Sequence, residues 1–278
     1  MNAFEQNPMP SAAYLARGAG AFSATTLTRG PWNPAHQHAG PPIALVCRAI
    51  LQAASAHGLT HIARLTANLW RPIPVGDATD PAHALRVNVT NDYVGKNAGH
   101  FSAQLVAQGK EVARFTALAQ RESALTLPAN LAGHPLPMAP ASPEASSPCQ
   151  FPFADGLPGY GELVELRSAC GSIFDGPSAI WFRLKRPLLA GESPSPYERV
   201  AAAADSGNGI SAVLDYKRDL FVNSDLTINL LRRPVGEWIC VDAQTWLGSH
   251  GGGLAESRLF DVAGLIGRAS QSLTIRLG

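Results

Sequence analysis

The segment Leu65-Thr-Ala-Asn-Leu-Trp-Arg71 returns later in the chain as Leu226-Thr-Ile-Asn-Leu-Leu-Arg232, with five of the seven residues identical. Each copy is soon followed by the tripeptide Pro-Val-Gly. A third match, between Val112-Ala-Arg114 and Ile266-Gly-Arg268, comes near the end of each half. Because three matches occur in the same order, the sequence favours a duplicated fold.

A proline-rich segment separates the two copies. Eight of the 22 prolines lie between Pro128 and Pro158, with serine, alanine and glycine among them. Such a composition resists helix and sheet and is typical of a linker or a surface excursion. We therefore expect an N-terminal repeat at residues 16–122, a linker at 123–158 and a C-terminal repeat at 159–278.

Each half is expected to contain one helix and a run of antiparallel strands. Apolar residues at helical spacing predict a helix over residues 40–56, and a second helix is expected over 195–215. Because the apolar face of a sheet must be covered, each half should be a sheet wrapped around its one helix, which is an α+β fold. The predicted strands are residues 22–28, 61–71, 84–94, 99–108 and 111–120 in the first half and 161–170, 178–186, 223–232, 237–247, 252–260 and 265–276 in the second.

The composition of the 278 residues narrows the classes of partner. Charged residues make up 15% of the chain and the formal net charge is +1, which favours neither nucleic acid nor an anionic membrane surface. The charged fraction is well below the average of about 25%. Such a chain can bury surface against further copies, so we expect a homodimer or a higher homo-oligomer.

Targeting signals and cysteine usage point to one compartment. Residues 1–8 have neither the basic start nor the apolar run of a secretory signal, and no apolar stretch reaches the ~18–20 residues of a membrane span. The four cysteines are far apart and form no Cys-x-x-Cys pair. We expect a cytoplasmic protein with reduced thiols and no membrane segment.

Asp205 follows four alanines and precedes Ser-Gly-Asn-Gly in the middle of the second predicted helix. Each glycine inside a helix costs about 1 kcal/mol relative to alanine, so this segment suggests a break in the helix or a close approach to its backbone. The carboxylate could hold a water molecule or act as a general base. It could also cap a helix that restarts after the break.

Two further polar groups belong to strands of the second half. Alternation along the last strand places Gln271 on the same side as Leu273, toward the core, where the first half has Ala117. A buried amide must be hydrogen-bonded, and a neighbouring backbone group could satisfy it as well as a site could. Asn223 and Ser224 stand where a strand begins, so they fit either a water-binding site or a strand-entry turn.

Two histidines, His36 and His38, lie just before the first predicted helix. The N-terminus of a helix presents free N–H groups and a partial positive charge, which can polarise a carbonyl group. A His-x-His pair without a third ligand is a weak zinc signature, and we expect no metal. The sequence also lacks the glycine motifs that bind phosphates and dinucleotides, so we expect no cofactor.

Together these segments resemble the acyl-CoA thioesterase II family and its relatives with a double hotdog fold. The most specific stretch is residues 221–276, which contains Arg233-Pro-Val-Gly-Glu-Trp238 and Gly267-Arg-Ala-Ser-Gln271-Ser. In the first half, His38-Ala-Gly-Pro-Pro and Arg71-Pro-Ile-Pro-Val-Gly76 match the family's pattern, although His-Gly-Gly is more usual there. The resemblance implies two tandem hotdog repeats, each an antiparallel sheet wrapped around a central helix.

The resemblance also implies hydrolysis of acyl-CoA to free acid and CoA by an oriented water molecule. The family's Asp and Gln map onto Asp205 and Gln271, and its third polar residue maps onto Asn223, with Ser224 as a neighbouring hydroxyl that could substitute. The implied partner is acyl-CoA, whose acyl chain would lie in an apolar tunnel beside the helix. The residues expected to contact the substrate, through free backbone N–H groups at a helix N-terminus or a glycine turn, are His38, Gly40, Gly207 and Gly209.

Two other interpretations stay open. Asn33-Pro34-Ala35-His36 matches the end of the Asp-x-Asn-Pro-x-His pattern of hotdog enoyl-CoA hydratases, but Pro31 stands where that pattern has its Asp. A non-catalytic acyl-CoA- or lipid-binding protein of the same fold would fit the Asn at position 223 and the altered turn at residues 38–40.

Overall fold

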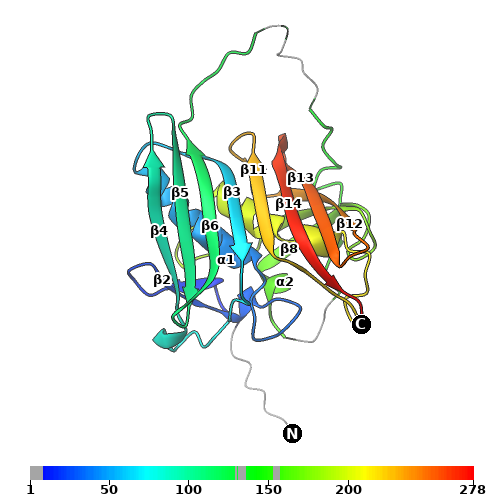
Figure 1. Cartoon of the computed structure of the whole chain (residues 1–278). Coiled ribbons are helices and arrows are strands. Elements are labelled where there is room, and N and C mark those ends of the chain that lie inside the picture. Colours follow the sequence, from blue (N-terminus) through cyan, green and yellow to red (C-terminus); the bar gives the residue numbers. More distant parts are fainter. Residues whose placement is uncertain (1–8, 129, 131–135, 153–156) are drawn as a thin grey trace.

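The structure is a computed structural model, and it describes residues 9–128, 130, 136–152 and 157–278. Residues 1–8, on which the expected lack of a secretory signal rests, lie outside the described residues. Part of the linker expected at 123–158 also lies outside them. Within the described part of the chain, 14 strands form one antiparallel sheet (Figure 1). None of the described helices is long and apolar enough to cross a membrane.

The strands of the first half occupy one side of this sheet. Their order from the outer edge inward is β1, β2, β4, β5, β6 and β3. The 3₁₀ turn Thr26–Thr28 and helix α1 (Gly40–Ser55) connect β2 to β3. The strand bounds are Tyr14–Ala16 for β1, Ala21–Ala24 for β2, His61–Leu69 for β3, Leu85–Val94 for β4, Ala98–Ala107 for β5 and Lys110–Gln120 for β6.

The strands of the second half continue the sheet in the order β11, β14, β13, β12, β9, β8 and β7, and β10 pairs with the end of β14. Their bounds are Ser147–Cys149 for β7, Val164–Cys170 for β8, Ser178–Leu184 for β9, Leu220–Asn223 for β10, Asp225–Leu230 for β11, Ile239–Leu247 for β12, Gly252–Asp261 for β13 and Gly264–Arg276 for β14. The helices of this half are α2 (Tyr160–Leu163), α3 (Pro196–Ala204) and α4 (Gly207–Ile210). The two halves therefore add strands outward from the centre in the same sequence of pairings.

The seam between the halves is the antiparallel pair of β3 and β11, which carry the repeated heptapeptides. Thr66 stands opposite Thr227 in this register, and their hydroxyl oxygens lie 3.2 Å apart. Thr66 also pairs with Thr116 on β6, and Thr227 pairs with Ser270 on β14. Positions that match in sequence thus occupy matching places on the two sides of the seam.

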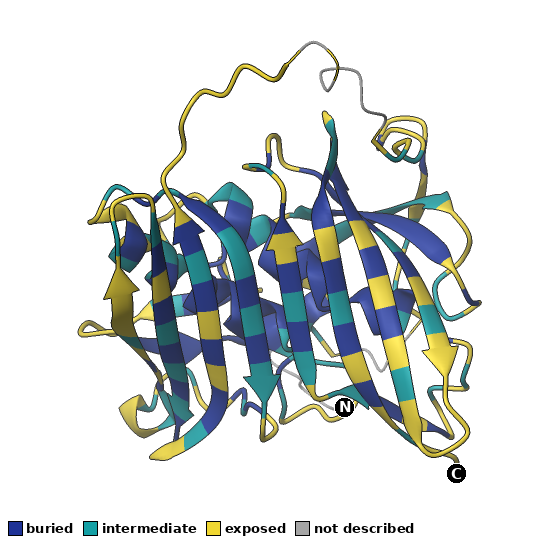
Figure 2. Cartoon of the chain, turned by 45° about the horizontal axis from the view of Figure 1, so that its top comes forward, coloured by how far each residue is buried: buried dark blue, intermediate teal, exposed yellow. Residues whose placement is uncertain are grey.

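Helices α1 and α3 pack against each other on one face of the sheet (Figure 2). The apolar positions that predicted α1, among them Ile43, Val46 and Ile50, are fully buried against the strands. The four alanines of α3 are also buried, and their small side chains let the two helices approach closely. The shared core lies between this helix pair and the inner face of the sheet.

The helix expected over residues 195–215 is shorter than predicted. It begins after Ser195, whose side chain and that of Glu198 form a capping box. It ends at Ala204 because the backbone N–H of Ser206 bonds to Ala203 three residues back, and the short α4 follows. The break suggested by the glycines is present, and it lies directly at Asp205.

Other expected elements differ at their ends. The strand expected over residues 22–28 stops at Ala24, and a 3₁₀ turn follows from Thr26. The strand expected from residue 161 is preceded by the short helix α2. The strand expected over 223–232 is divided at Ser224 into β10 and β11. The proline-rich segment, expected to resist sheet, contributes β7 at the sheet edge, where Pro148 can be tolerated.

The loop after β11 is held to β13 by one buried carboxylate. The side chain of Asp261 accepts two hydrogen bonds of 2.6 Å from Arg232 and bonds of 2.8 Å from the backbone N–H groups of Val235 and Ala263. Burial opposes ionisation of Asp261, but these four donors outweigh it and hold its pKa below the ordinary value. The second Pro-Val-Gly segment is positioned by this contact.

We expect Asp261→Asn to lower the free energy of unfolding by about 2 kcal/mol, because an amide cannot accept all four hydrogen bonds. Since the folded pKa lies below the unfolded one, the carboxylate stabilises the protein above about pH 4, and this contribution disappears as the pH falls through the folded pKa. Urea unfolding at pH 7 and pH 3 measures both effects. Asp242→Asn, which removes a partner of the exposed Arg258, should cost less than about 1 kcal/mol. An unchanged midpoint for Asp261→Asn would contradict the assignment.

Candidate active site

The carboxylate of Asp205 lies where α3 ends, and its residue is 4% exposed. One carboxylate oxygen accepts a hydrogen bond of 2.9 Å from the amide of Asn223 and lies 3.5 Å from the amide nitrogen of Gln271. The other oxygen lies 3.1 Å from Nδ1 of His38. The three residues mapped as catalytic by resemblance, Asp205, Gln271 and Asn223, therefore form one cluster, and His38 joins it from the first half of the chain.

A carboxylate at the C-terminus of a helix faces the negative end of the helix dipole, and burial adds a desolvation cost. Both oxygens of Asp205 have polar partners, which offsets this cost. The first turn of α1, with its positive N-terminal end, lies beside the end of α3. A Cβ on Gly40 would stand 2.4 Å from the carbonyl oxygen of Ala202. Position 40 therefore requires glycine, because any side chain would push the two helices apart.

The amide of Gln271 is fully hydrogen-bonded although the residue is 2% exposed. Its oxygen accepts a bond of 2.9 Å from the backbone N–H of Asn208, and its nitrogen donates a bond of 3.0 Å to the backbone carbonyl of Asp205. A Cβ on Gly207 would come within 2.9 Å of the same amide oxygen. Gln271 thus ties both sides of the helix break to β14, and Gly207 makes the room for it.

His38 contacts three neighbouring groups. Its ring stacks on the ring of Tyr160 with centroids 4.0 Å apart and planes 16° from parallel. Its Nδ1 faces both the carboxylate of Asp205 and, at 3.0 Å, the backbone N–H of Gly40. Burial lowers the pKa of His38, and the charge of Asp205 opposes this only in part, so the imidazole is neutral at neutral pH.

The protonation state of Nδ1 determines whether His38 forms a hydrogen bond with Asp205 or with Gly40. If Nδ1 carries the proton it donates to Asp205, and if Nδ1 is bare it accepts from Gly40 instead. The first arrangement leaves Nε2 as an unprotonated acceptor, and within the described residues Nε2 has no hydrogen-bond partner. It also frees the N–H of Gly40. The next two residues of α1, Pro41 and Pro42, have no N–H to offer.

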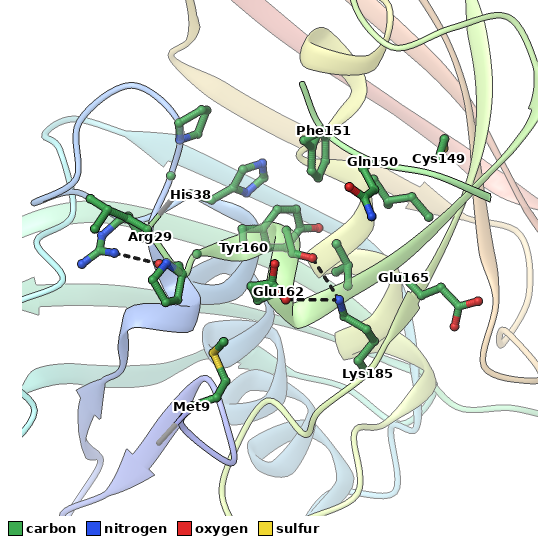
Figure 3. Close-up of a pocket in the computed structure, with 18 of the residues that line it drawn as sticks. Met9, Arg29, His38, Cys149, Gln150, Phe151, Tyr160, Glu162, Glu165 and Lys185 are labelled. Atoms are coloured by element: carbon green, nitrogen blue, oxygen red, sulfur yellow. Dashed lines mark hydrogen bonds and ion pairs between the residues drawn. The ribbon is translucent and has the colours of Figure 1, made fainter. Parts of the chain in front are cut away.

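A cavity of about 590 Å³ adjoins this cluster and is lined by both His38 and Tyr160 (Figure 3). Asp205, Asn223 and Gln271 do not line it, so His38 is the side chain that connects the cavity to the carboxylate. Both polar and apolar residues line it. The other side chains named in Figure 3 are Met9, Arg29, Cys149, Gln150, Phe151, Glu162, Glu165 and Lys185.

Two of the expected site residues lie apart from the cluster. The side chain of Ser224 is exposed, and its hydroxyl lies 3.4 Å from that of Thr274. Ser224 forms the bend between β10 and β11, whereas the side chain of Asn223 reaches the buried carboxylate of Asp205. Gly209 lies on α4 with no group within 4 Å of its Cβ position. Ser224 therefore does not join the contacts of Asp205 in the described structure, and its role as a substitute hydroxyl stays a prediction.

The hydratase-like segment forms a surface turn before the site. The side chain of Asn33 accepts a hydrogen bond of 2.8 Å from the backbone N–H of Ala35, and His36 bridges to Pro74. Neither side chain contacts Asp205 in the described structure. Nor does any group of three or more His, Cys, Asp or Glu residues suited to a metal ion occur among residues 9–128, 130, 136–152 and 157–278.

Sequence reasoning missed Tyr160. It lies just after the proline-rich segment, in the residues Leu157-Pro-Gly-Tyr160, where no periodic pattern marks a buried aromatic. A single tyrosine next to Pro and Gly is typical of a loop. Its stacking on the ring of His38 is seen only in the folded structure. The contact between His38 and Asp205 was also not predicted, because the sequence analysis gave His38 only a role in substrate binding.

Comparison with known proteins places the chain in a family. A sequence profile described as the acyl-CoA thioesterase N-terminal domain matches residues 28–120, and one described as the acyl-CoA thioesterase C-terminal domain matches residues 135–275. The chain therefore belongs to the acyl-CoA thioesterase family that these two domains define. None of the curated protein sequences matches it significantly.

Solved structures show the fold. A candidate thioesterase from Novosphingobium aromaticivorans superposes with a TM-score of 0.71 at 19% identity, covering 95% of this chain and 98% of that one. A protein from Alicyclobacillus acidocaldarius with a hotdog fold gives 0.70 at 17% identity, covering 96% and 97%. The acyl-CoA thioesterase II from Mycobacterium marinum gives 0.64 at 13% identity, covering 95% of each chain. The chain thus shares the hotdog fold of these proteins over nearly its whole length.

The different surroundings of Asn223 and Ser224 give a paired test. Asn223→Ala should lower the activity proposed below at least tenfold, because it removes the donor that fixes one oxygen of Asp205. Ser224→Ala should stay within about twofold of the wild type, because its hydroxyl is exposed and lies near Thr274, away from Asp205. Steady-state kinetics of both variants decide the matter, and a larger loss in Ser224→Ala would contradict the orientation described here.

Proposed function

We propose that this chain hydrolyses acyl-CoA thioesters to free acid and CoA. The observation that carries the proposal is the buried carboxylate of Asp205, which contacts Asn223 through one oxygen and His38 through the other, because His38 in turn lines a cavity of about 590 Å³. Membership of the acyl-CoA thioesterase family supports the reaction class. The acyl-CoA substrate and the roles of the individual residues are part of the proposal.

We further infer that the chain is a covalent double hotdog. Its repeats would be residues 16–122 and 159–278, joined by the segment 123–158, and each would wrap its sheet around one central helix. The mirrored order of strands about the β3–β11 seam supports this inference. So does the packing of α1 against α3, one helix from each half.

In this proposal only the second repeat supplies the carboxylate and the two amide side chains of the site. In the first repeat, Ile62 occupies the position that matches Asn223, and Ala117 occupies the position that matches Gln271. Ile62 lines a void of only about 10 Å³ between the helices and the central strands. That void is about the size that one water molecule needs, and the acyl tunnel expected beside the helix stays a prediction.

The cluster suggests how water would be activated. With Nδ1–H of His38 donating to Asp205, Nε2 can take a proton from a water molecule while that water's oxygen bonds to the thioester carbon. Collapse of the tetrahedral intermediate breaks the C–S bond, and the same proton passes from Nε2 to the departing sulfur. The products are the free acid and the CoA thiol, and Asp205 stabilises the transient imidazolium throughout.

The oxyanion that develops on the thioester carbonyl oxygen needs a hydrogen-bond donor to stabilise it. The backbone N–H of Gly40 is released from His38 when Nδ1 carries its proton, and it lies at the positive end of α1. A preorganised N–H of this kind is typical of oxyanion stabilisation. This role makes Gly40 part of the catalytic arrangement as well as of the helix contact.

The number of copies in the assembly and the location in the cell stay predictions from composition. The low charged fraction of 15% is compatible with a homodimer or a larger homo-oligomer, and the spacing of the cysteines with a cytoplasmic setting. Light scattering coupled to size-exclusion chromatography measures the first of these directly.

Release of free thiol from a panel of acyl-CoAs of increasing chain length tests the activity. We expect turnover by the wild type and a loss of at least 100-fold in kcat for Asp205→Asn, because the amide cannot stabilise a charged His38. Asp92→Asn, on the exposed end of β4, is the matched control and should behave like the wild type. Binding of acyl-CoA without turnover would instead favour the non-catalytic binding protein, and hydration of a crotonyl-type substrate would favour the hydratase.

The pH dependence of kcat/KM follows from the pKa of His38. The base must be neutral, and burial lowers its pKa below the ordinary value of about 6.5, so the acidic limb of the profile should lie below pH 6.5. In Asp205→Asn the charge that raises this pKa is removed, so the limb of the residual activity should move further down. A limb above pH 7, or an upward move in Asp205→Asn, would argue against His38 as the base.

A further inference from the structure

Tyr160 contacts both His38 and the helix end that carries Asp205. Its ring forms the stack on His38 described above, and its hydroxyl donates a hydrogen bond of 2.6 Å to the backbone carbonyl of Ala202, three residues before Asp205. The hydroxyl of Ser206, directly after Asp205, lies 3.5 Å from the same phenol oxygen. The side chain of Tyr160 therefore contacts the imidazole of His38 and also forms a hydrogen bond to the helix end that carries Asp205.

The carbonyl of Ala202 is available to Tyr160 because of the helix break. In an uninterrupted helix it would accept the N–H of Ser206, but that N–H bonds to Ala203 instead. The free carbonyl is buried beside Gly40, where a missing partner would be costly. Tyr160 supplies that partner, and burial raises its pKa, so the phenol remains a protonated donor over the working pH range.

From this geometry we propose that Tyr160 is a positioning residue that sets the orientation of His38 toward Asp205. The stack fixes the plane of the imidazole, and the hydroxyl fixes the last turn of α3. Both restraints act on the distance between Nδ1 and the carboxylate. Tyr160 also forms part of the cavity wall, so a ligand entering the cavity would contact the ring that holds His38 in place. The proposal deepens the proposed function and rests on it only for its kinetic part.

The groups around His38 determine how Tyr160 affects the pKa of its imidazole. Asp205 faces it from α3 and Tyr160 from α2, and Asp205 is the group whose charge acts on its pKa. The ring of Tyr160 covers one face of the imidazole and so excludes water from it. Removal of this ring should let the pKa of His38 return toward its ordinary value. The other titratable side chains that line the same cavity are Arg29, Cys149, Glu162, Glu165 and Lys185.

Two variants separate the two contacts of Tyr160. Tyr160→Phe keeps the stack and removes the hydroxyl, so the pKa of His38 should stay at the wild-type value while kcat falls several-fold at unchanged KM. Tyr160→Leu removes both contacts, so the pKa of His38 should rise by at least half a unit and kcat should fall about 100-fold, as expected when a catalytic group is misplaced by about 1 Å. Tyr93→Leu, at an exposed tyrosine on β4, is the control and should change neither quantity.

The pKa of His38 is measured by NMR titration of the imidazole nitrogens, with the signal assigned from a His38→Gln variant. Circular dichroism reports whether each variant is folded.

A His38 titration in folded Tyr160→Leu that matches the wild type would overturn the proposal, as would unchanged kcat in both variants. If the wild type turns over no thioester, the proposed function fails while the titration still decides the role of Tyr160. If Tyr160→Leu does not fold, the Tyr160→Phe kinetics decide it, since unchanged kcat there overturns the hydroxyl's part in positioning.

Discussion

The antiparallel pairing of β3 with β11 is the contact on which the rest of the structure depends. Because Thr66 stands opposite Thr227, the two halves continue one sheet and share one inner face. Both α1 and α3 must cover that face, and they can do so only side by side. The start of α1 then meets the end of α3, which brings His38 from one half to Asp205 from the other. The register of two strands thereby determines which side chains can form the site.

A carboxylate at the buried C-terminal end of a helix lowers stability, and several features of the neighbouring sequence offset this loss. The helix breaks after Ala204, the amide of Gln271 bonds to both sides of the break, and Gly207 leaves the space for it. Each of these features would be unfavourable in an ordinary amphipathic helix packed on a sheet. Local violations of folding rules that compensate one another are typical of functional sites.

The sequence was informative where a feature repeats or alternates. The duplicated heptapeptide identified the strands that meet at the seam, and alternation along β14 placed Gln271 in the core as observed. It was uninformative where position depends on distant contacts. The bend at Ser224 turns that side chain away from Asn223's side, and nothing in Asn-Ser-Asp signals which of the first two residues faces inward. Tyr160 follows a segment whose proline content hides any periodic pattern, so its contact with His38 could not be predicted.

The two sides of the seam show why one scaffold can carry a site on one side only. At the positions that match Asn223 and Gln271, the first half has Ile62 and Ala117, which need no hydrogen bonds when buried. Burial of these apolar side chains carries no cost for desolvating a polar group. The second half keeps its polar cluster because the buried side chains of Asp205 and Gln271 have hydrogen-bond partners, and His38 from the first half is one of the groups that contact Asp205. A second polar site would need a second set of such partners. The apolar half is therefore best understood as the support that allows the polar half to depart from ideal packing.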